Sequence, residues 1–367
     1  MLEPLSGYAS GILEGISRYS QQKANWRIAY FDRERKELAD LVESWEGDAI
    51  ICTAVDSRFY EAAISREIPV INVAGLLDEE GLPSVLSDDV AIGRMAADHF
   101  IARGFSEFAF LSRRDGSHYA ENRGRGFRER IGESGGSCYP LTVSASGGDA
   151  ELRDKLANLP RPLALFASLD RLGAMALEAC WKAGFDVPGE IAVLGAGNHR
   201  QLCELCCPTL SSVEADMERR GYEAAALLDR ILSGAQAPDE PLRIAPAHIA
   251  ERGSTDSYAF EDSDVVAALR FIRDHADRTI KVRDVVAATG LSRRTLEGRF
   301  NQLVGRTLHE EIWRTHFDLA KRLLSSSDLD LQGVAERSGF RTASALVNLF
   351  RQRLGVTPKR FRVDNRR

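Results

Sequence analysis

The sequence DVVAATGLSRRTLEGRF, residues 284–300, decides how the C-terminal part of the chain folds. A short apolar helix is expected to end at Gly290, and a second helix is expected to begin at Ser292. Leu296 and Phe300 stand four residues apart in that second helix, so they share one face and are expected to be buried. Two short helices joined by a glycine turn, with a serine cap on the second, are typical of a helix-turn-helix.

The same spacing occurs again in LQGVAERSGFRTASALVNLF, residues 331–350. Gly339 takes the place of the turn glycine, and Thr342 takes the place of the cap. Leu346 and Phe350 repeat the apolar pair. The sequence therefore predicts two helix-turn-helix units in one chain, which is far more specific than a single match. A plain helical bundle is the alternative.

Residues 307–327, TLHEEIWRTHFDLAKRLLSSS, separate the two units and have helical periodicity over about five turns. Such a helix would hold the units one DNA turn apart, about 34 Å. Together with GVTPKRF at residues 355–361, the last hundred residues resemble the DNA-binding domain of the AraC family of transcription regulators. The resemblance implies double-stranded DNA, an operator or promoter, as a partner.

The charge of the chain is divided between its two parts. Residues 264–367 contain 21 Lys and Arg against 12 Asp and Glu, whereas residues 1–263 contain 27 against 42. The net charge of -6 for the whole chain therefore hides a basic C-terminal segment. Such a segment suits DNA, because counterion release from Lys and Arg contacts supplies most of the non-specific affinity.

In an AraC-type module the second helix of each unit enters the major groove and reads base edges through its exposed face. Arginine is suited to guanine and glutamate to cytosine, whereas a less polar face suits thymine methyl groups or phosphates. The candidate DNA-binding residues are Arg293, Arg294, Thr295, Glu297 and Arg299 in the first unit and Thr342, Ala343, Ser344, Val347 and Asn348 in the second.

Both recognition helices depart from the pattern of that family. An Arg usually stands two residues before the last Phe, and here those positions hold Gly298 and Asn348. Glycine inside a helix costs about 1 kcal/mol relative to alanine, so Gly298 weakens the first recognition helix. We still expect the first unit to supply most of the affinity, through Arg293 and Arg294. The second unit is expected to position the protein or to contact another protein.

Residues 1–250 alternate short apolar runs with amphipathic segments, which predicts parallel sheets covered by helices on both faces in a doubly wound fold. A length of about 250 residues suits two lobes. The expected helices include residues 89–104 and 170–184, and the expected strands are residues 26–31, 48–53, 68–73, 108–111, 141–144, 163–168 and 191–196.

Several strings in this part follow, in order, the pattern of the effector domain of LacI-type repressors, which resembles the periplasmic sugar-binding proteins. They include IPVINV at residues 68–73, NRGRGFRERI at 122–131 and TLSSVEADMERRGYEAAALLDRIL at 209–232. PSVLSDDVAIGRMAADHFIARGF and DRLGAMALEACWKAGFDVPGEIAVLGAGN, which begin at Pro83 and Asp170, belong to the same series. The whole chain thus resembles the xylose-regulator type of the AraC family.

That resemblance implies an α/β two-lobed periplasmic-binding-protein-like sensor domain followed by an all-α double helix-turn-helix DNA-binding domain. It also implies a transcription activator that forms a homodimer and responds to a small effector, such as a sugar. RNA polymerase is a further expected partner. We expect residues 1–250 to form the sensor, 251–263 a linker and 264–367 the DNA-binding domain, with Asp264 capping its first helix.

The start of the chain departs from the sensor pattern. MLEPLSGYASGILEGISRYS, residues 1–20, matches the first ligand-contacting turn and the first helix of the pattern, without the strand that precedes them. Such a lobe would expose the edges of the neighbouring strands. We therefore expect either that the native protein starts upstream of Met1 or that another segment covers this gap.

Ligands of two-lobed α/β proteins bind outside the carboxyl ends of the strands. At the second-lobe positions where the family carries an Asn and an Asp, this chain has Leu169 and Gly197, so two polar contacts for sugar hydroxyls are lost. We therefore expect a small-molecule effector, with a sugar-like ligand as one option. The candidates are Ser6, Tyr8, Asp88 and Arg123, which the resemblance implies, with Asp170 and Asn198 beside the two lost positions.

Two of these candidates have an alternative interpretation: Asp88 as the cap of the helix that follows it, and Arg123 as a surface residue. No metal site or cofactor is expected, because the CxxCC cluster of Cys203, Cys206 and Cys207 lacks a second CxxC or a His pair. Neither an export signal nor an apolar run of about 18 residues is visible, so the protein is expected to be cytoplasmic.

Two other classes of protein share doubly wound folds. An enzyme would need a phosphate-binding glycine turn or another catalytic motif, and the chain contains no GxxxxGK[ST] or HExxH. A solute-binding protein without DNA function would not need the basic C-terminal segment. We therefore expect a regulator and no enzymatic activity. A salt series on bound DNA separates a regulator from both alternatives.

Overall fold

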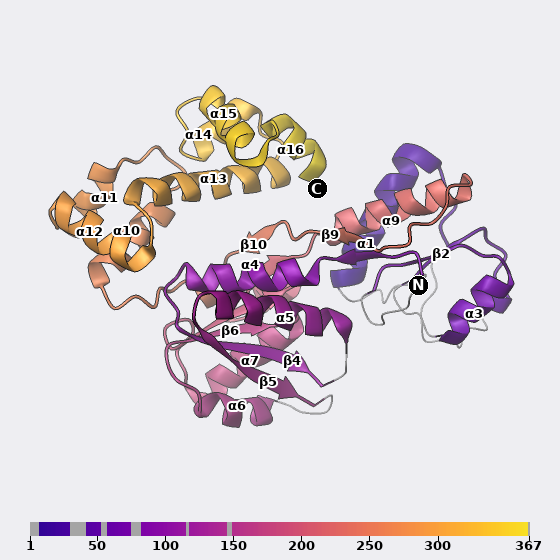
Figure 1. Cartoon of the computed structure of the whole chain (residues 1–367), viewed down its shortest axis with the longest axis horizontal. Coiled ribbons are helices and arrows are strands. Elements are labelled where there is room, and N and C mark those ends of the chain that lie inside the picture. Colours follow the sequence, from indigo (N-terminus) through magenta and orange to yellow (C-terminus); the bar gives the residue numbers. More distant parts are fainter. Residues whose placement is uncertain are drawn as a thin grey trace. The chain divides into compact units, whose positions relative to one another are not determined.

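The computed structural model describes residues 7–29, 42–52, 57–74, 82–114, 117–144 and 149–365. The chain divides into two compact units, which Figure 1 shows. The first unit comprises Met1–Ile101 and Ser106–Ser257, and the second comprises Ala102–Phe105 and Tyr258–Arg367. The first unit combines strands and helices, and the second contains α-helices, which confirms the predicted fold class.

One lobe of the first unit is built on a six-stranded sheet with the order β10-β8-β7-β6-β4-β5. The neighbours from β5 to β8 pair in parallel, and β10 pairs with β8 in the antiparallel direction. The strands are β4 (Glu107–Arg113), β5 (Ser137–Val143), β6 (Leu163–Ala167), β7 (Ile191–Ala196), β8 (Ser211–Glu214) and β10 (His248–Ala250).

Helices cover both faces of this sheet, because alternate residues of each strand point to opposite sides. Phe108 and Phe110 of β4 lie with their ring centroids 6.4 Å from that of Phe127 in α5. Ala109 and Leu111 belong instead to the core that α6 and α7 share with the sheet. Figure 1 shows α4 beside α5 on one side of the strands. The helices are α4 (Asp89–Ile101), α5 (His118–Glu133), α6 (Asp149–Ala157), α7 (Asp170–Ala183) and α8 (Arg200–Leu205).

The other lobe contains two parallel strand pairs, β1 with β2 and β3 with β9. Its helices α1 and α9 pack closely at two glycines. A Cβ on Gly15 would lie 1.9 Å from the carbonyl oxygen of Glu218, and a Cβ on Gly221 would lie 2.0 Å from that of Ile12. Only glycine permits this approach. The elements are α1 (Gly7–Tyr19), η1 (Ser20–Ala24), β1 (Ile50–Cys52), α3 (Ser57–Ser65), β2 (Val70–Asn72), β3 (Val85–Ser87), α9 (Met217–Leu232) and β9 (Leu242–Ile244).

Six of the seven expected strands are present, with shifted ends. The expected strand at residues 26–31 is wrong for residues 26–29, which adopt no strand structure, and residues 30–31 lie outside the described part of the chain. Strands β3, β8, β9 and β10 were not expected. Each of them has only three or four residues, and none lies in a continuous apolar run such as those around β1 and β2.

The junction between the units differs from the expected linker at residues 251–263. Residues 251–257 belong to the first unit, where Gly253–Thr255 forms the short helix η2. Ser254 is completely buried there; its Oγ donates to the carbonyl oxygen of Val193 at 2.6 Å and accepts from the amide of Ser211 at 2.8 Å. The expected linker is therefore divided between the two units.

The second unit has two apolar cores that share the long helix α13 (Leu308–Ser326). Leu308 and Ile312 from its beginning belong to the first core, and Ala320 and Leu324 from its end belong to the second. This confirms the long helix expected between the two recognition units. The other helices are α10 (Ser263–Asp274), α11 (Val282–Thr289), α12 (Arg293–Val304), α14 (Leu331–Arg337), α15 (Ala343–Leu354) and α16 (Pro358–Asn365).

The first helix of this unit is capped by Asp262, so the expected cap at Asp264 is wrong. The Oδ1 atom of Asp262 accepts hydrogen bonds from the amides of Asp264 and Val265 at 3.0 and 3.2 Å. An aspartate at either position satisfies the pattern in the sequence, and the backbone decides between them.

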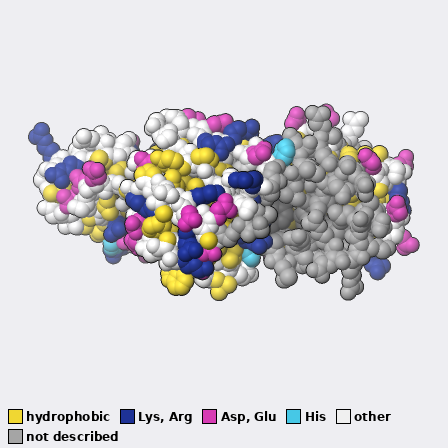
Figure 2. Space-filling model, turned by 90° about the horizontal axis from the view of Figure 1, so that it is seen from below, with side chains coloured by type: hydrophobic (Ala, Val, Ile, Leu, Met, Phe, Trp, Pro, Cys, Tyr) yellow, Lys and Arg dark blue, Asp and Glu magenta, His cyan; other side chains and the backbone are white. Residues whose placement is uncertain are grey.

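The surface combines charged side chains of both signs with scattered apolar ones, as the face drawn in Figure 2 shows. Trp181 and Leu205 are exposed, but single apolar side chains of this kind are common on protein surfaces. Among the described residues, none of the helices combines the length and the hydropathy that crossing a bilayer requires.

Candidate nucleic-acid interface and effector site

The first helix-turn-helix forms where the local sequence predicts it. Helix α11 ends at Gly290, whose φ of 70° lies in the left-handed region that favours glycine. Ser292 caps α12, because its Oγ accepts a hydrogen bond from the amide of Thr295 at 3.2 Å. Leu296 and Phe300 are fully buried, which confirms the expected apolar face and leaves the opposite face of α12 to solvent.

The second helix-turn-helix repeats this construction. Gly339 has a φ of 74° between α14 and α15. Thr342 caps α15 by accepting from the amide of Ala345 at 3.2 Å. Leu346 and Phe350 are fully buried, as expected. Each unit therefore presents a capped helix whose polar side remains outside the core.

The arginines of α12 differ in the side chains that hold them. Arg293 donates from Nε to Glu297, one turn along the helix, at 2.9 Å. Arg299 lies 3.4 Å from each of two carboxylates at the start of α10. Arg294 is exposed, and no residue in the described part of the chain forms an ion pair or hydrogen bond with it. Of these three side chains, Arg294 is the one that can contact DNA without giving up a partner.

The other candidate residues are less available. Thr295 shares a hydrogen bond of 2.8 Å with Ser292, and the hydroxyl of Thr342 is engaged in capping. Sequence reasoning missed Arg341, which is exposed immediately before the cap of α15 and has no ion-pair partner among the described residues. Its position in the turn of a recognition unit is the feature of the sequence that could have identified it. On the second recognition helix, Ser344 and Asn348 are exposed, whereas Ala343 and Val347 are half-buried.

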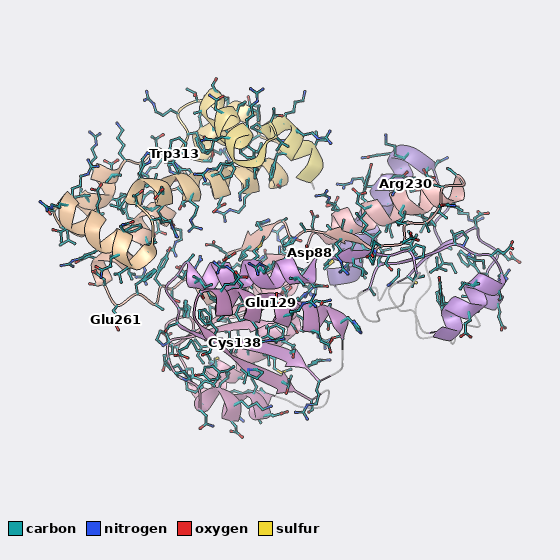
Figure 3. The ribbon with its side chains drawn as sticks, in the orientation of Figure 1. Asp88, Glu129, Cys138, Arg230, Glu261 and Trp313 are labelled. Atoms are coloured by element: carbon teal, nitrogen blue, oxygen red, sulfur yellow. The ribbon has the colours of Figure 1, made fainter. Side chains whose placement is uncertain are left out.

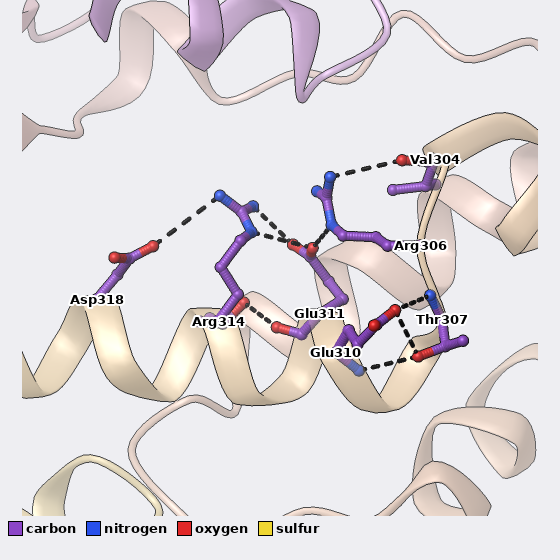
Figure 4. A network of polar contacts seen from close by, with 8 residues as sticks. Val304, Arg306, Thr307, Glu310, Glu311, Arg314 and Asp318 are labelled. Atoms are coloured by element: carbon purple, nitrogen blue, oxygen red, sulfur yellow. Dashed lines mark hydrogen bonds and ion pairs between the residues drawn. The ribbon is translucent and has the colours of Figure 1, made fainter. Parts of the chain in front are cut away.

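A polar network at the start of α13 fixes the turn that leaves α12 (Figure 4). The carboxylate of Glu311 is 5% exposed and lies between the guanidinium groups of Arg306 and Arg314, the latter at 2.8 Å. Burial acts to raise the pKa of Glu311, but the hydrogen bonds and charges of Arg314 and Arg306 outweigh it and lower the pKa below its usual range. The ionised carboxylate therefore ties the first recognition unit to the connecting helix.

In the first unit, Asp88 caps the helix that follows it. Its Oδ1 accepts from the amide of Ala91 at 3.0 Å, and Figure 3 shows Asp88 at the beginning of α4. Arg123 is buried, so it is not the surface residue that was considered as an alternative. Its Nε donates to Asp89 at 2.7 Å, and its Nη1 donates to the carbonyl oxygen of Ser168 at 2.6 Å. The arginine therefore joins the first turn of α4 to the carboxyl end of β6.

Asp170 is buried at the start of α7, just after β6. Its carboxylate accepts from the hydroxyl of Ser212 at 2.5 Å and from the amide of His199 at 2.6 Å. Burial raises the pKa of Asp170, against which these two hydrogen bonds act. Beside it, Gly197 has a φ of 121°, so an aspartate would be strained at this position.

Asn198 follows in the left-handed conformation, with a φ of 51°. Its amide nitrogen Nδ2 donates to Glu214 at 2.7 Å, and its Oδ1 accepts from Arg252 at 2.8 Å. Its backbone amide donates to the same Ser212 hydroxyl that bonds Asp170. Asp170 and Asn198 are thus brought together in one network, and sequence reasoning missed Glu214 and Arg252, which complete it from distant parts of the chain.

The remaining candidates lie at the start of the chain. Ser6 lies outside the described residues, and Tyr8 belongs to α1, but its side chain is not among those described. In the cysteine cluster, Cys203 is buried, Cys206 donates to the carbonyl oxygen of Leu202 at 3.2 Å and Cys207 is exposed. Among the described residues, no group of three or more His, Cys, Asp or Glu could hold a metal ion.

Comparison with protein families divides the chain in the same way. A family model for a periplasmic binding protein-like domain matches residues 97–255, and one for a helix-turn-helix domain matches residues 285–363. The first match spans the strands of the six-stranded sheet together with α9 and β9 of the other lobe, and the second spans the paired recognition units.

Relatives with this combined organisation are similar over almost the full length. The xylose operon regulatory protein of Escherichia coli strain K12 is 29% identical over 98% of this chain and 94% of its own. That of Haemophilus influenzae is 29% identical over 97% of this chain and 95% of its own. The structure of a xylose-binding transcription activator matches with a TM-score of 0.63 and 26% identity, covering 100% of this chain and 97% of that one.

Proposed function

We propose that the chain is a transcription regulator of the AraC type with a periplasmic binding protein-like sensor domain. A neutral sugar bound by this sensor controls its action on DNA. The observation that supports an effector site most strongly is the polar network at the strand ends. There Arg123 binds Asp89 and the carbonyl oxygen of Ser168, and Ser212 joins Asp170 to Asn198, within the same chain as two recognition helices.

D-xylose is the first effector to test, because the relatives are named for the xylose operon. A bound ligand stabilises the folded protein by mass action, by about 2.7 kcal/mol at a hundredfold excess over Kd. Thermal unfolding with D-xylose, D-ribose, D-glucose and xylitol should therefore give a rise in Tm for at least one neutral compound. If none of these four compounds raised Tm, whereas a charged compound such as D-xylonate did, a neutral sugar would be excluded.

The effector acts by stabilising one arrangement of the two sensor lobes. It changes the affinity for DNA only if DNA binds to that arrangement with a different affinity than to the other. The effect is then a coupling between two sites. Coupling is reciprocal, so DNA must change the affinity for the effector by the same factor as the effector changes the affinity for DNA. Titrating D-xylose with and without DNA measures this factor.

On DNA, α12 supplies most of the affinity through Arg293 and Arg294, and α15 positions the protein. The less polar face of α15 also suits a contact with RNA polymerase, which an activator requires. Because phosphate contacts release counterions, the affinity for DNA should fall steeply with salt concentration. An affinity that is independent of salt would contradict this assignment.

We further infer that the regulator acts in the cytoplasm as a homodimer. One chain already contains two recognition units, and the dimer is what the AraC resemblance implies. Light scattering with D-xylose and DNA should give the mass of the DNA fragment plus twice that of the 40.5 kDa chain. Only monomer, with and without these ligands, would contradict the dimer while leaving DNA binding by a single chain intact.

A further inference from the structure

Ser168 is a buried hydroxyl that the protein itself does not satisfy. The residue follows β6 and is 1% exposed, and its Oγ has no hydrogen-bond partner among the described residues. Its backbone is engaged on both sides: the amide donates to the carbonyl oxygen of Leu111 at 2.8 Å, and the carbonyl accepts from Arg123. A buried hydroxyl without a hydrogen-bond partner destabilises the folded protein. Its presence at this position indicates that a ligand supplies the missing hydrogen bond.

Other buried serines of the same lobe are satisfied. The hydroxyl of Ser212 donates to Asp170, and that of Ser254 donates to the carbonyl oxygen of Val193. Ser211 accepts from the amide of Arg252 at 2.8 Å. The lobe thus pairs these three hydroxyls internally, and Ser168 is the exception at the strand ends where ligands of such folds bind.

Arg123, which bonds the backbone carbonyl of Ser168, has a second donor that no described residue engages. Its Nε and Nη1 are occupied by Asp89 and by the carbonyl of Ser168, whereas its Nη2 has no hydrogen-bond partner in the described part of the chain. The two bonds hold the guanidinium in one orientation. Because the Asp89 carboxylate lies 2.7 Å away, the positive charge of Arg123 is already balanced. The pair of donors therefore suits a neutral oxygen better than a carboxylate.

We propose that Ser168 is an effector contact of the second lobe, whose Oγ holds, together with Nη2 of Arg123, one hydroxyl group of a neutral polyhydroxy compound. This inference rests on the proposed function and specifies the chemistry of its site. Ser168 would replace the polar contact that is missing at the adjacent Leu169, which is half-buried. A hydroxyl both accepts and donates, so it can accept from Arg123 and donate to Ser168 at once.

The test compares Ser168→Ala with Ser254→Ala, a buried serine whose hydroxyl is fully bonded. Without ligand, the Tm of Ser168→Ala should equal or exceed that of the wild type, because removing an unpaired hydroxyl costs no hydrogen bond. The Tm of Ser254→Ala should fall. With D-xylose as the probe, calorimetry should show at least a tenfold loss of affinity for Ser168→Ala, and D-xylonate should bind the wild type more weakly than D-xylose does.

The outcomes separate this inference from the proposed function. If the wild type binds D-xylose and Ser168→Ala binds it equally well, Ser168 is not a contact and the inference fails alone. A fall in the Tm of ligand-free Ser168→Ala as large as that of Ser254→Ala also overturns it, because the hydroxyl is then structural. If the wild type binds neither D-xylose, D-ribose nor xylitol, the neutral-sugar effector of the proposed function is itself wrong.

Discussion

Arg294 differs from its neighbours because no described side chain holds it. Arg294→Ala should therefore weaken binding to a specific DNA fragment by about tenfold or more, since a base or phosphate contact of this kind is worth about 1 to 3 kcal/mol. Arg293→Ala should have a smaller effect, because Glu297 already offsets part of its charge. Fluorescence anisotropy at one salt concentration measures both.

Arg200→Ala is the control for this series, because Arg200 is an exposed arginine on α8 of the sensor and pairs with Glu204. Its affinity for DNA should equal that of the wild type. Equal binding by Arg294→Ala and the wild type would show that α12 does not contact DNA through this side chain.

His316 makes the helical unit sensitive to acid. Burial lowers its pKa, against which a hydrogen bond with the backbone of Arg278 acts. In the unfolded chain His316 takes up a proton near pH 6.5, whereas in the folded protein it does so only at lower pH. Below about pH 6.5 the unfolded state therefore binds more protons than the folded state, and the free energy of unfolding decreases as pH falls. Hydrogen-exchange protection factors in α13 to α15, corrected for intrinsic rates, should fall in that range for the wild type and less so for His316→Gln.

His309→Gln provides the comparison, because His309 is an exposed histidine on the same helix. Its protection factors should follow those of the wild type with pH. If His316→Gln and the wild type lost protection in parallel, His316 would not be the group responsible.

At the scale of elements, α12 carries an avoidable weakness at Gly298. The residue is exposed within the helix, and a Cβ added to it would meet nothing within 4 Å. Gly298→Ala should therefore raise the free energy of unfolding of the helical unit by about 1 kcal/mol. Chemical denaturation measures this change.

Gly290→Ala is the matched control, one turn before the same helix. A Cβ there also meets nothing within 4 Å, but the φ of 70° strains any other residue, so this variant should be destabilised by about 1 kcal/mol. If Gly290→Ala and Gly298→Ala changed the free energy of unfolding in the same direction, the backbone conformation would not explain how these two glycines differ.

The turn between α12 and α13 depends on the carboxylate of Glu311. Glu311→Gln leaves Arg306 and Arg314 without their shared anion and should destabilise the helical unit by about 1.5 kcal/mol, because the carboxylate is buried whereas both arginines reach solvent. Asp318→Asn, at the exposed end of the network, should change stability by less than about 0.5 kcal/mol. Equal denaturation midpoints for both variants would show that Glu311 is not essential to the turn.

The recognition units could be predicted from the sequence because their signals are local. Ser292, Thr342 and the two apolar pairs act within one or two helical turns, and all of them take the expected places. Short strands and the exact cap of α10 could not be predicted in this way. Asp262 and Asp264 are chemically equivalent, and the choice depends on where the backbone begins to turn.

At the scale of the whole molecule, the sensor site resisted prediction because its residues meet only through the fold. The sequence pattern predicted Asp88 as an effector contact. In the structure Asp88 caps α4, and Arg123 binds the neighbouring Asp89 instead. Asn198 is held by Glu214 and Arg252, which lie 16 and 54 positions further along the chain. No spacing rule links such positions, and the unpaired hydroxyl of Ser168 has no signature in sequence at all.

The affinity for DNA with and without saturating D-xylose tests the central claim most directly. Fragments are first selected from a random pool by the full chain, and their binding is then measured by anisotropy at fixed salt. An effector-controlled regulator predicts specific binding whose Kd changes at least fivefold with D-xylose, the lower range of allosteric coupling. Specific binding that saturating D-xylose leaves unchanged, although the sensor binds the sugar, would contradict it.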